Sequence, residues 1–359
     1  MKYIYSLLLV IATLAAHSQV LAPKYSNEFL AIGVGARALG MGRTQTAVAA
    51  DVTAGYWNPA GLLDIKAKYE VSLMHAEYFA GIAKYDYLAF ATPIDSVSHL
   101  AVSVIRFGVD DIPDTRFLFD ANGAINYNNI TFFSAADYAF LFSYARRFPK
   151  LSGLKFGANA KIIHRTVGPF ANAWGFGFDV GLLLDRKNWR FGAMLRDVTS
   201  TFNTWSVNTA LLEEVYAKTN NTLRGNYTEL TLPRLSAGLA YRWRIRENFG
   251  ALLAADADFS FDGKRNVLIK SNAVSVDPRV GIELDYKQIV FVRGGAGDVQ
   301  QIKDYNAATK LYDRTVTVFQ PNMGVGIRLN KFQIDYALTD IGDRSESLYS
   351  NVFSLKVGF

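Results

Sequence analysis

The stretch LSAGLAYRWRIRENFGALLAADADFSF, residues 235–261, contains two runs of alternating side chains separated by a polar turn. Every second residue from Leu235 to Ile245 is apolar, and so is every second residue from Ala251 to Phe261. The residues between them include arginine and aspartate. A repeat of two is the period of a β-strand, whose side chains point alternately to the two faces of a sheet. The stretch therefore predicts an antiparallel strand pair with one apolar and one polar face.

The same period continues through most of the chain after residue 67, and segments with the period of a helix are rare there. The predicted strands are 68–80, 84–94, 97–107, 136–148, 152–165, 172–186, 188–197, 232–245, 248–262, 276–287, 289–299, 316–329, 331–341 and 348–359. These are about fourteen strands, an even number, as single-chain outer-membrane barrels require.

Strand length and loop length distinguish a membrane barrel from a soluble sandwich, since both kinds of fold alternate. Many of the runs reach about ten residues, the length that a tilted strand needs to cross a bilayer, whereas soluble strands centre on about 5 to 6. Tight turns near residues 95, 150, 187, 247, 287 and 330 alternate with longer connections at 108–135, 198–231, 263–275, 300–315 and 342–347. Short periplasmic turns and long extracellular loops are typical of such barrels. We therefore predict an all-β fold, a transmembrane antiparallel β-barrel surrounded by lipid in the bacterial outer membrane.

The first 67 residues do not alternate. Residues 1–18 combine the basic Lys2, an apolar core and small residues at the spacing that signal peptidase requires, which predicts a signal peptide. Residues 19–67 are rich in small side chains that allow close backbone packing. A barrel of this size has a lumen too wide for its own side chains to fill. We predict that residues 19–67 form an N-terminal hatch, or plug, inside a barrel of residues 68–359; an ordinary loop before the first strand is the alternative.

Composition excludes several classes of function. The chain has no cysteine, which removes disulfides, zinc–thiolate sites and thiol catalysis. Its four histidines lack the spacing of metal ligands, and the Gly-x-Gly pairs at 33–35 and 40–42 open no strand–helix unit of a dinucleotide site. The net charge is +6, but the basic residues are scattered. We therefore predict no enzyme, no metal, no cofactor and no nucleic-acid partner.

Charged residues fall on the polar face of several predicted strands, where they would line the lumen. The positions considered are Arg242, Arg244, Asp256, Asp258, Glu283 and Asp285. Buried charges must be paired, so the mixed signs predict a self-neutralising network that braces the hatch. A polar conduit is the alternative, and mixed signs argue against a strongly ion-selective pore.

Two of the long extracellular loops, 108–135 and 198–231, are apolar enough to argue against disorder. Their candidate contact residues are Phe117, Phe119, Phe132, Phe133, Phe202, Trp205, Leu212 and Tyr216. Residues 209–218, TALLEEVYAK, predict a short helix capped by Thr209. Such loops suit either a partner-docking surface or an entry site for a hydrophobic ligand.

A family resemblance lies in the N-terminal region, in the motif FLAIGVGARALGMG and the turn YWNPAGLL. The residues that carry it are Gly33, Gly35, Gly40, Gly42, Asp51, Trp57, Asn58, Pro59, Ala60 and Gly61. This region resembles the hatch of the FadL-like (OMPP1/FadL/TodX) outer-membrane barrel superfamily. Within that superfamily it is similar to the PorV/PorQ family found in Bacteroidota.

The resemblance implies two different functions. PorV-like proteins belong to the type IX secretion system, where they associate with the translocon and hand folded cargo to an attachment complex. FadL-like proteins instead carry hydrophobic solutes, such as long-chain fatty acids or aromatic hydrocarbons. We expect the first function, a non-enzymatic component of protein secretion that binds translocon, attachment complex or cargo proteins through its extracellular loops. A channel for hydrophobic small molecules is the alternative, and a purely structural barrel is a third possibility.

Overall fold

The computed structural model describes most of the chain after the N-terminal region. The described residues are 26–120, 122–148, 150, 152–222, 225–306, 311–339, 341 and 350–359. The predicted signal peptide, residues 1–18, and the first residues of the predicted hatch, 19–25, lie outside them.

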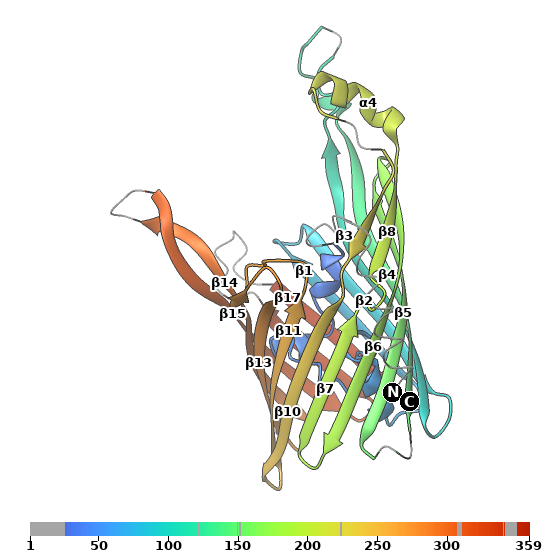
Figure 1. Ribbon diagram of the computed structural model, residues 1–359, viewed down its shortest axis with the longest axis vertical. Coiled ribbons are helices and arrows are strands. Elements are labelled where there is room, and N and C mark those ends of the chain that lie inside the picture. The colour runs from blue at the N-terminus through green and yellow to red at the C-terminus, as the bar shows by residue number, and fades with distance from the viewer. Residues whose placement is uncertain are drawn as a thin grey trace, which may run out of the picture.

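Fourteen antiparallel strands close into a barrel, and β1 pairs with both β2 and β17 to complete the ring (Figure 1). The strands of the ring are β1 Glu70–Tyr78, β2 Ala83–Pro93, β3 Ser98–Asp114, β4 Thr131–Arg147, β5 Leu154–Val167, β6 Ala171–Arg186, β7 Trp189–Arg196, β10 Arg234–Arg246, β11 Phe249–Ser260, β13 Ser275–Tyr286, β14 Val290–Asn306, β15 Leu311–Leu329, β16 Phe332–Thr339 and β17 Ser350–Gly358. Each overlaps one predicted strand, so the predicted fold class is confirmed.

The alternation of the sequence becomes an apolar outer wall and a mixed inner wall. Leu73, Leu88, Phe142 and Phe176 face outward on four different strands and are 37–49% exposed. Large apolar side chains exposed around a closed barrel indicate a surrounding hydrocarbon phase, because a closed ring of strands leaves no sheet edge unpaired in lipid. The protein is therefore a barrel of the bacterial outer membrane. None of the helices in the described residues is long and apolar enough to cross a membrane.

The predicted long loops contain more regular structure than expected. Loop 108–135 is wrong as a loop, because β3 and β4 run into it from both sides and leave only the tip with η3 Tyr127–Asn129. Loop 198–231 contains β8 Thr201–Val207, α4 Thr209–Lys218 and β9 Tyr227–Thr231. Backbone pairing explains both errors, since a strand continues above the membrane wherever a neighbour offers a partner.

The connection 198–231 extends the barrel wall upward. β8 pairs with the upper part of β6, above the segment of β6 that pairs with β7, and β9 then pairs with β8. α4 lies at the top of this extension (Figure 1). The predicted helix 209–218 is present, but its cap is Asn208 rather than Thr209, which is already the first helical residue.

The predicted loop 300–315 is also largely strand. β14 and β15 continue as a hairpin that projects sideways from the barrel (Figure 1). The pairing of β13 with β14 stops at Val280 and Ala296, and the pairing of β15 with β16 stops at Met323 and Leu338. The two-residue strand β12 Ile269–Lys270 pairs with the start of β13, within the predicted loop 263–275.

Residues 26–67, called the N-terminal segment below, lie inside the barrel and contact its inner wall. Figure 1 draws their short helices in blue within the ring of strands. These helices are η1 Glu28–Ala31, α2 Ala36–Gly40, α3 Ala54–Trp57 and η2 Pro59–Asp64. α2 contacts β14 to β17, while η2 contacts β3 to β6, so the segment reaches across the lumen.

Candidate functional site

A band of glycines on the inner wall receives the backbone of the N-terminal segment. Its members are Gly157 on β5, Gly181 on β6, Gly192 on β7, Gly238 on β10, Gly281 on β13, Gly295 on β14 and Gly324 on β15. A Cβ at Gly157 would lie 2.3 Å from the Ala60 nitrogen, and one at Gly295 would lie 2.1 Å from the Met41 carbonyl carbon. No side chain fits at such distances, so the segment approaches the wall backbone to backbone.

The glycines also match across neighbouring strands. Gly157 is opposite Gly181, Gly192 is opposite Gly238, and Gly281 is opposite Gly295. Three cross-strand pairs therefore form flat areas on the lumenal face. Because glycine in a strand costs stability, a close approach of another backbone is the physical reason for such pairs.

Asn58 fixes the segment at the turn that the sequence singles out. Its backbone is extended, with φ −160° and ψ 102°, as expected of a residue before proline. Its side-chain oxygen accepts from the Ala60 nitrogen at 3.3 Å, and its Nδ2 donates to the carbonyls of Thr46 at 2.8 Å and Leu182 at 3.0 Å. One buried amide thus caps η2 and ties the segment to β6.

Two of the motif glycines are required for different reasons. Gly33 has φ +102°, and a Cβ there would lie 2.9 Å from the Trp57 ring, whose Nε1 donates to the Val34 carbonyl at 2.9 Å. Gly61, which lies in the turn YWNPAGLL, has no such φ; its Cβ would lie 2.2 Å from the Ala49 carbonyl oxygen. Close packing, and not turn geometry, explains Gly61.

Each charged residue of the described N-terminal segment up to Asp64 has a partner on the wall or the loop above it. The pairs are Glu28 with Arg234 and Arg265, Arg37 with Glu283, Arg43 with Asp298, Asp51 with Lys356, and Asp64 with Lys155 and Arg190. Buried ions need such pairing because desolvation is costly. Burial raises the pKa of the Asp51 carboxyl, but Lys356 and Arg37 outweigh burial and hold that pKa well below its usual range.

The pair Arg37–Glu283 belongs to a larger buried network. Arg37 Nε donates to Glu283 at 2.7 Å, and Arg293 Nε donates to the same carboxylate at 2.8 Å. Arg293 Nη1 reaches Asp335 at 2.7 Å, and its side chain is fully buried. The network joins α2 to β13, β14 and β16.

The predicted lumenal charges divide into three groups. Asp258 and Glu283 are paired, with Arg279 at 2.6 Å and with the network above. Asp256 accepts instead from the backbone nitrogens of Gln45 and Thr46, at 2.8 and 2.9 Å. Arg242 lies 3.6 and 3.9 Å from its nearest carboxylates on Glu283 and Asp285, and Arg244 is exposed at the rim.

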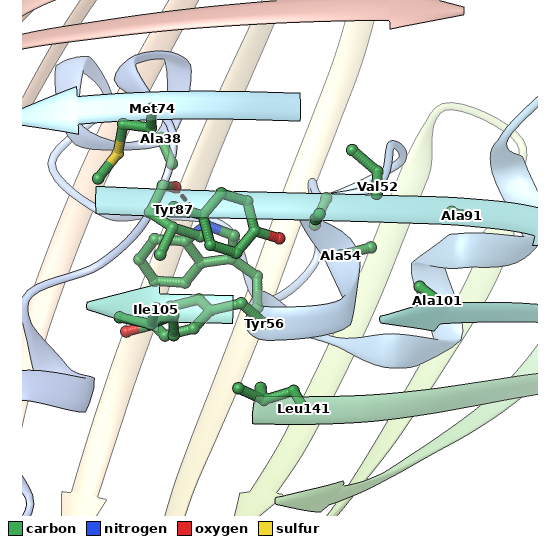
Figure 2. Close-up of a cluster of buried hydrophobic side chains, with 14 of the residues drawn as sticks. Ala38, Val52, Ala54, Tyr56, Met74, Tyr87, Ala91, Ala101, Ile105 and Leu141 are labelled. Carbon is green, nitrogen blue, oxygen red and sulfur yellow. Dashed lines mark hydrogen bonds between the residues drawn. The ribbon is translucent and has the colours of Figure 1, made fainter. Parts of the chain in front are cut away.

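The opposite side of the lumen is apolar. A cluster of buried aromatic and aliphatic side chains fills the space between the N-terminal segment and β1 to β4. Figure 2 shows Tyr87 and Ile105 from two wall strands near Tyr56 of α3, and Met74 of a third strand beside Ala38. Tyr85 joins the cluster and donates from its hydroxyl to the Phe29 carbonyl at 3.1 Å.

A β-bulge interrupts the wall just above this apolar cluster. Val109 pairs with Ala135 and Ile112 pairs with Phe133, so two residues of β3 stand opposite one of β4. Asp111, inside the bulge, has φ +57°. The β2–β3 pairing ends at Val109, so β3 has no β2 partner above the bulge. Phe107, two residues below Val109, packs against the cluster, with its ring 6.1 Å from that of Tyr85.

Two polar cavities flank the N-terminal segment. One of about 410 Å³ lies on the extracellular side and is lined by η1 together with residues of β10, β11 and β13. The other, of about 770 Å³, lies at the end of the barrel with the tight turns and is lined by residues 47–51 and 64–67 and by those turns. The segment therefore separates an extracellular from a periplasmic space.

The residues proposed for the extracellular loops have unequal exposure. Phe117, Phe119 and Phe132 are 56–65% exposed, whereas Phe133 packs edge-on against Phe170. Phe202 faces outward on β8, while Leu212 and Tyr216 are half-buried on α4.

Trp205, which the sequence predicts as a partner- or ligand-contact residue, is buried. It is stacked near Tyr227 with Arg165 over its ring, because inward positions of β8 continue the lumenal face. Arg116 Nη1 donates to the Leu211 carbonyl at 2.9 Å, which links the two predicted loops to each other.

The wall glycines and the tyrosines of the apolar cluster were not among the residues predicted from the sequence. The glycines occur at every second position of strands, as in GFGFDVG at 175–181, and small residues on an otherwise regular face were the available signal. Tyr85 and Tyr87 alternate with charged Lys84 and Asp86, which is a reversed pattern for a membrane strand. At these positions the apolar side chains of β2 face inward and the charged ones outward, and the inward side chains form part of the packed core.

No protein-family model matches the chain, and no curated protein matches it. Solved structures do match in fold. The Pseudomonas putida toluene transporter TodX has a TM-score of 0.57 at 14% identity, over 91% of this chain and 98% of that one. The CymD monoaromatic hydrocarbon channel has 0.55 at 12%, over 91% and 98%. A Pseudomonas aeruginosa FadL homologue has 0.51 at 12%, over 90% and 97%. The fold is thus that of FadL-type barrels.

Proposed function

We propose that the protein is a channel for hydrophobic small molecules in which the N-terminal segment acts as a hatch. The observation that carries this proposal is the position of the apolar cluster, directly inside the wall where the bulge at Asp111 interrupts β3. A hydrophobic solute needs an apolar path past polar headgroups, and an aromatic cluster behind an irregular strand offers one. The toluene transporter TodX and the hydrocarbon channel CymD, similar in fold, support the same class of solute.

Access to the cluster would be controlled by η1. Phe29 belongs to the cluster and Leu30 packs against it, while Glu28 pairs with Arg234 and Arg265 on the other side of the lumen. Asn27 Nδ2 also donates to Thr231 Oγ1 at 2.8 Å. Apolar contacts are non-directional, so an apolar solute can replace Phe29 and Leu30 once these polar ties open.

A reversible disulfide cross-link tests the proposal. Because the chain has no native cysteine, only the introduced pair can form a disulfide. Asn27→Cys with Thr231→Cys would tie η1 to β9, and a matched pair, Thr204→Cys with Thr228→Cys, would tie β8 to β9 without touching the segment. We expect uptake of a radiolabelled aromatic hydrocarbon or fatty acid to fall on oxidation of the first pair and to recover with reductant. Unchanged uptake in the oxidised first pair, or equal inhibition in the matched pair, would contradict a moving hatch.

A second function, the PorV/PorQ-like role in type IX protein secretion, is favoured by one observation. The start of β4 and the connection between β3 and β4 expose Phe117, Phe119 and Phe132, and exposed aromatic side chains are typical of protein-binding surfaces. Its partners would be the translocon, an attachment complex or cargo proteins.

The two proposed functions predict different effects of removing α4. Replacing residues 209–218 with a short Gly-Ser turn removes the helix and leaves β8 and β9 paired, which deletion of all of 198–231 would not. If the protein serves secretion, this variant no longer co-purifies secretion proteins and keeps solute uptake. Full recovery of the same proteins with the variant would refute the docking role of α4.

A further inference from the structure

The periplasmic cavity has an excess of positive charge. Eight basic and five acidic side chains line its volume of about 770 Å³. The acidic groups already have partners: Asp64 and Asp185 pair with Lys155 and Arg190, and Asp51 pairs with Lys356. Glu283 already accepts from two arginines, and Glu70 accepts from the Val52 nitrogen.

Two arginines at this cavity have no carboxylate within hydrogen-bonding distance among the described residues. Arg242 is half-exposed and lies 3.6 Å from Glu283 and 3.9 Å from Asp285, too far for a hydrogen bond. Arg328 donates from Nε and Nη2 to the neutral Gln333 oxygen, at 2.9 and 2.7 Å, and stacks over Phe291. Their guanidinium groups retain donors that a bound oxyanion could accept.

Three lysines extend the positive charge to the mouth of the cavity. Lys66, Lys187 and Lys331 line it and are exposed, and within the described part of the chain no carboxylate oxygen lies within 4.0 Å of their ammonium groups. Charges of one sign at the mouth of a cleft concentrate ligands of the opposite sign. The lysines would attract an anion, and the arginines would hold it.

We propose that this cavity binds small multivalent anions, such as a phosphate ester or a polycarboxylate, at the periplasmic mouth of the barrel. Its volume lies in the range of small-molecule sites, about 300 to 1,000 Å³. Arginine pairs bidentately with phosphate and carboxylate, and several cations around one space favour a ligand with more than one negative charge. The cavity shares Ile65 and Ala67 with the edge of the apolar cluster but none of the cluster's aromatic side chains, so it does not depend on the hydrophobic channel proposed above.

Calorimetric titration of the full-length protein with inorganic pyrophosphate, in a zwitterionic detergent at low salt, tests this site. The cavity variant is Arg242→Gln with Arg328→Gln. The matched control is Arg246→Gln with Lys287→Gln, which removes the same charge from the same rim outside the cavity. We expect the cavity variant to lose about tenfold or more in affinity, and the control to lose much less.

Equal losses in the two variants would mean diffuse attraction and would overturn the proposal. So would the absence of pyrophosphate binding by the unchanged protein, or binding of an acidic peptide alone. If the cavity variant does not fold, Trp189 provides a second measurement, because it lines the cavity. Pyrophosphate should then change the tryptophan fluorescence of the unchanged protein and not that of Trp189→Phe, which still binds in the calorimeter. A fluorescence change that persists in Trp189→Phe would place the anion elsewhere.

Discussion

The two sides of the lumen hold the N-terminal segment by different means. Toward β1 to β4 the contacts are aromatic and aliphatic, with Tyr56, Tyr85, Tyr87 and Ile105 almost completely buried. Toward the wall from β5 round to β17 they are ion pairs and glycine contacts, which include Glu283 and the band of glycines. Hydrophobic burial has no direction, whereas ion pairs and backbone contacts fix position closely.

This difference assigns separate tasks to the two sides. The charged side sets where the segment lies along the wall, because Arg37 pairs with the Glu283 carboxylate and Gly40 fits against the backbone of Met323 and Gly324. The apolar side adds stability and can repack, because side chains of similar volume substitute for one another at small cost. The proposed hatch function, in which the segment keeps its position and yet admits an apolar solute, requires both properties. Four substitutions test this division, from the largest expected effect to the smallest.

Removal of the central carboxylate should have the largest effect. Glu283→Gln leaves Arg37 and Arg293 buried without their shared counter-ion, and breaking a buried pair in this way costs about 3–5 kcal/mol. Denaturant unfolding followed by heat-modifiable mobility in gels measures the loss. The control is Asp110→Asn on the outer face of β3, whose contacts with Lys84 and Arg106 are 3.4 Å long and exposed to solvent. A comparable loss in both variants would contradict the special position of Glu283.

Truncation on the apolar side should cost somewhat less. Ile105→Ala removes a fully buried side chain from the cluster and leaves a cavity, which costs about 2–5 kcal/mol depending on how far the neighbours collapse. In contrast to Glu283→Gln, the loss should not depend on salt, and an apolar solute that fills the cavity should restore part of it. Unfolding with and without a small aromatic hydrocarbon makes the comparison, and Val102→Ala on the lipid side of β3 is the control. Equal rescue of both variants would contradict an internal site.

The sequence predicted the wall far better than the lumen. The strand period predicted all fourteen strands because the side chains toward lipid are apolar and many of those toward the lumen are polar. Leu239, for example, faces lipid, whereas Asp256 on the neighbouring strand faces the lumen. Loop ends were missed because β3 and β8 continue above the membrane, where the alternation no longer contrasts lipid with water. Trp205 was placed in a loop for the same reason.

The contacts inside the lumen could not be predicted from the sequence, for another reason. The motif from Gly33 to Gly61 indicated a closely packed segment, and Gly40, Gly42 and Gly61 do meet backbone atoms in the structure. Which wall glycine meets which residue depends on how strands far apart in the chain are arranged in the ring. The pair of Arg37 with Glu283, 246 residues away, follows from that arrangement and from no local pattern.

The wall glycines offer a test in which neighbouring residues face opposite ways. Gly295→Val would place a side chain 2.1 to 2.5 Å from Met41 and Gly42, and overpacking costs about 1–3 kcal/mol. Gly294, the next residue of β14, faces outward, and its nearest neighbour would be Ile282 at 3.7 Å. We expect Gly295→Val to expose the N-terminal segment to trypsin in the folded barrel and Gly294→Val to leave it protected. Protection of both variants would show that the segment does not need the glycine band.

The smallest effect should come from acid, through Asp51. Its pKa in the folded protein is depressed by Lys356 and Arg37, so the carboxylate stabilises the seated segment at pH values above the unfolded pKa of about 3.9. That contribution should be lost progressively as the pH falls below this value, since the proton removes the charge that Lys356 contacts at 2.6 Å. Trp57 fluorescence between pH 7 and pH 2 follows the segment, and Asp51→Asn should be less protected from protease at pH 7 and should lack this part of the acid response. An acid profile identical in the two proteins would assign the response to other carboxylates of the charged side. The effect is small because Asp51 is one of five charged anchors, and the glycine contacts and the apolar cluster still hold the segment when this single pair is lost.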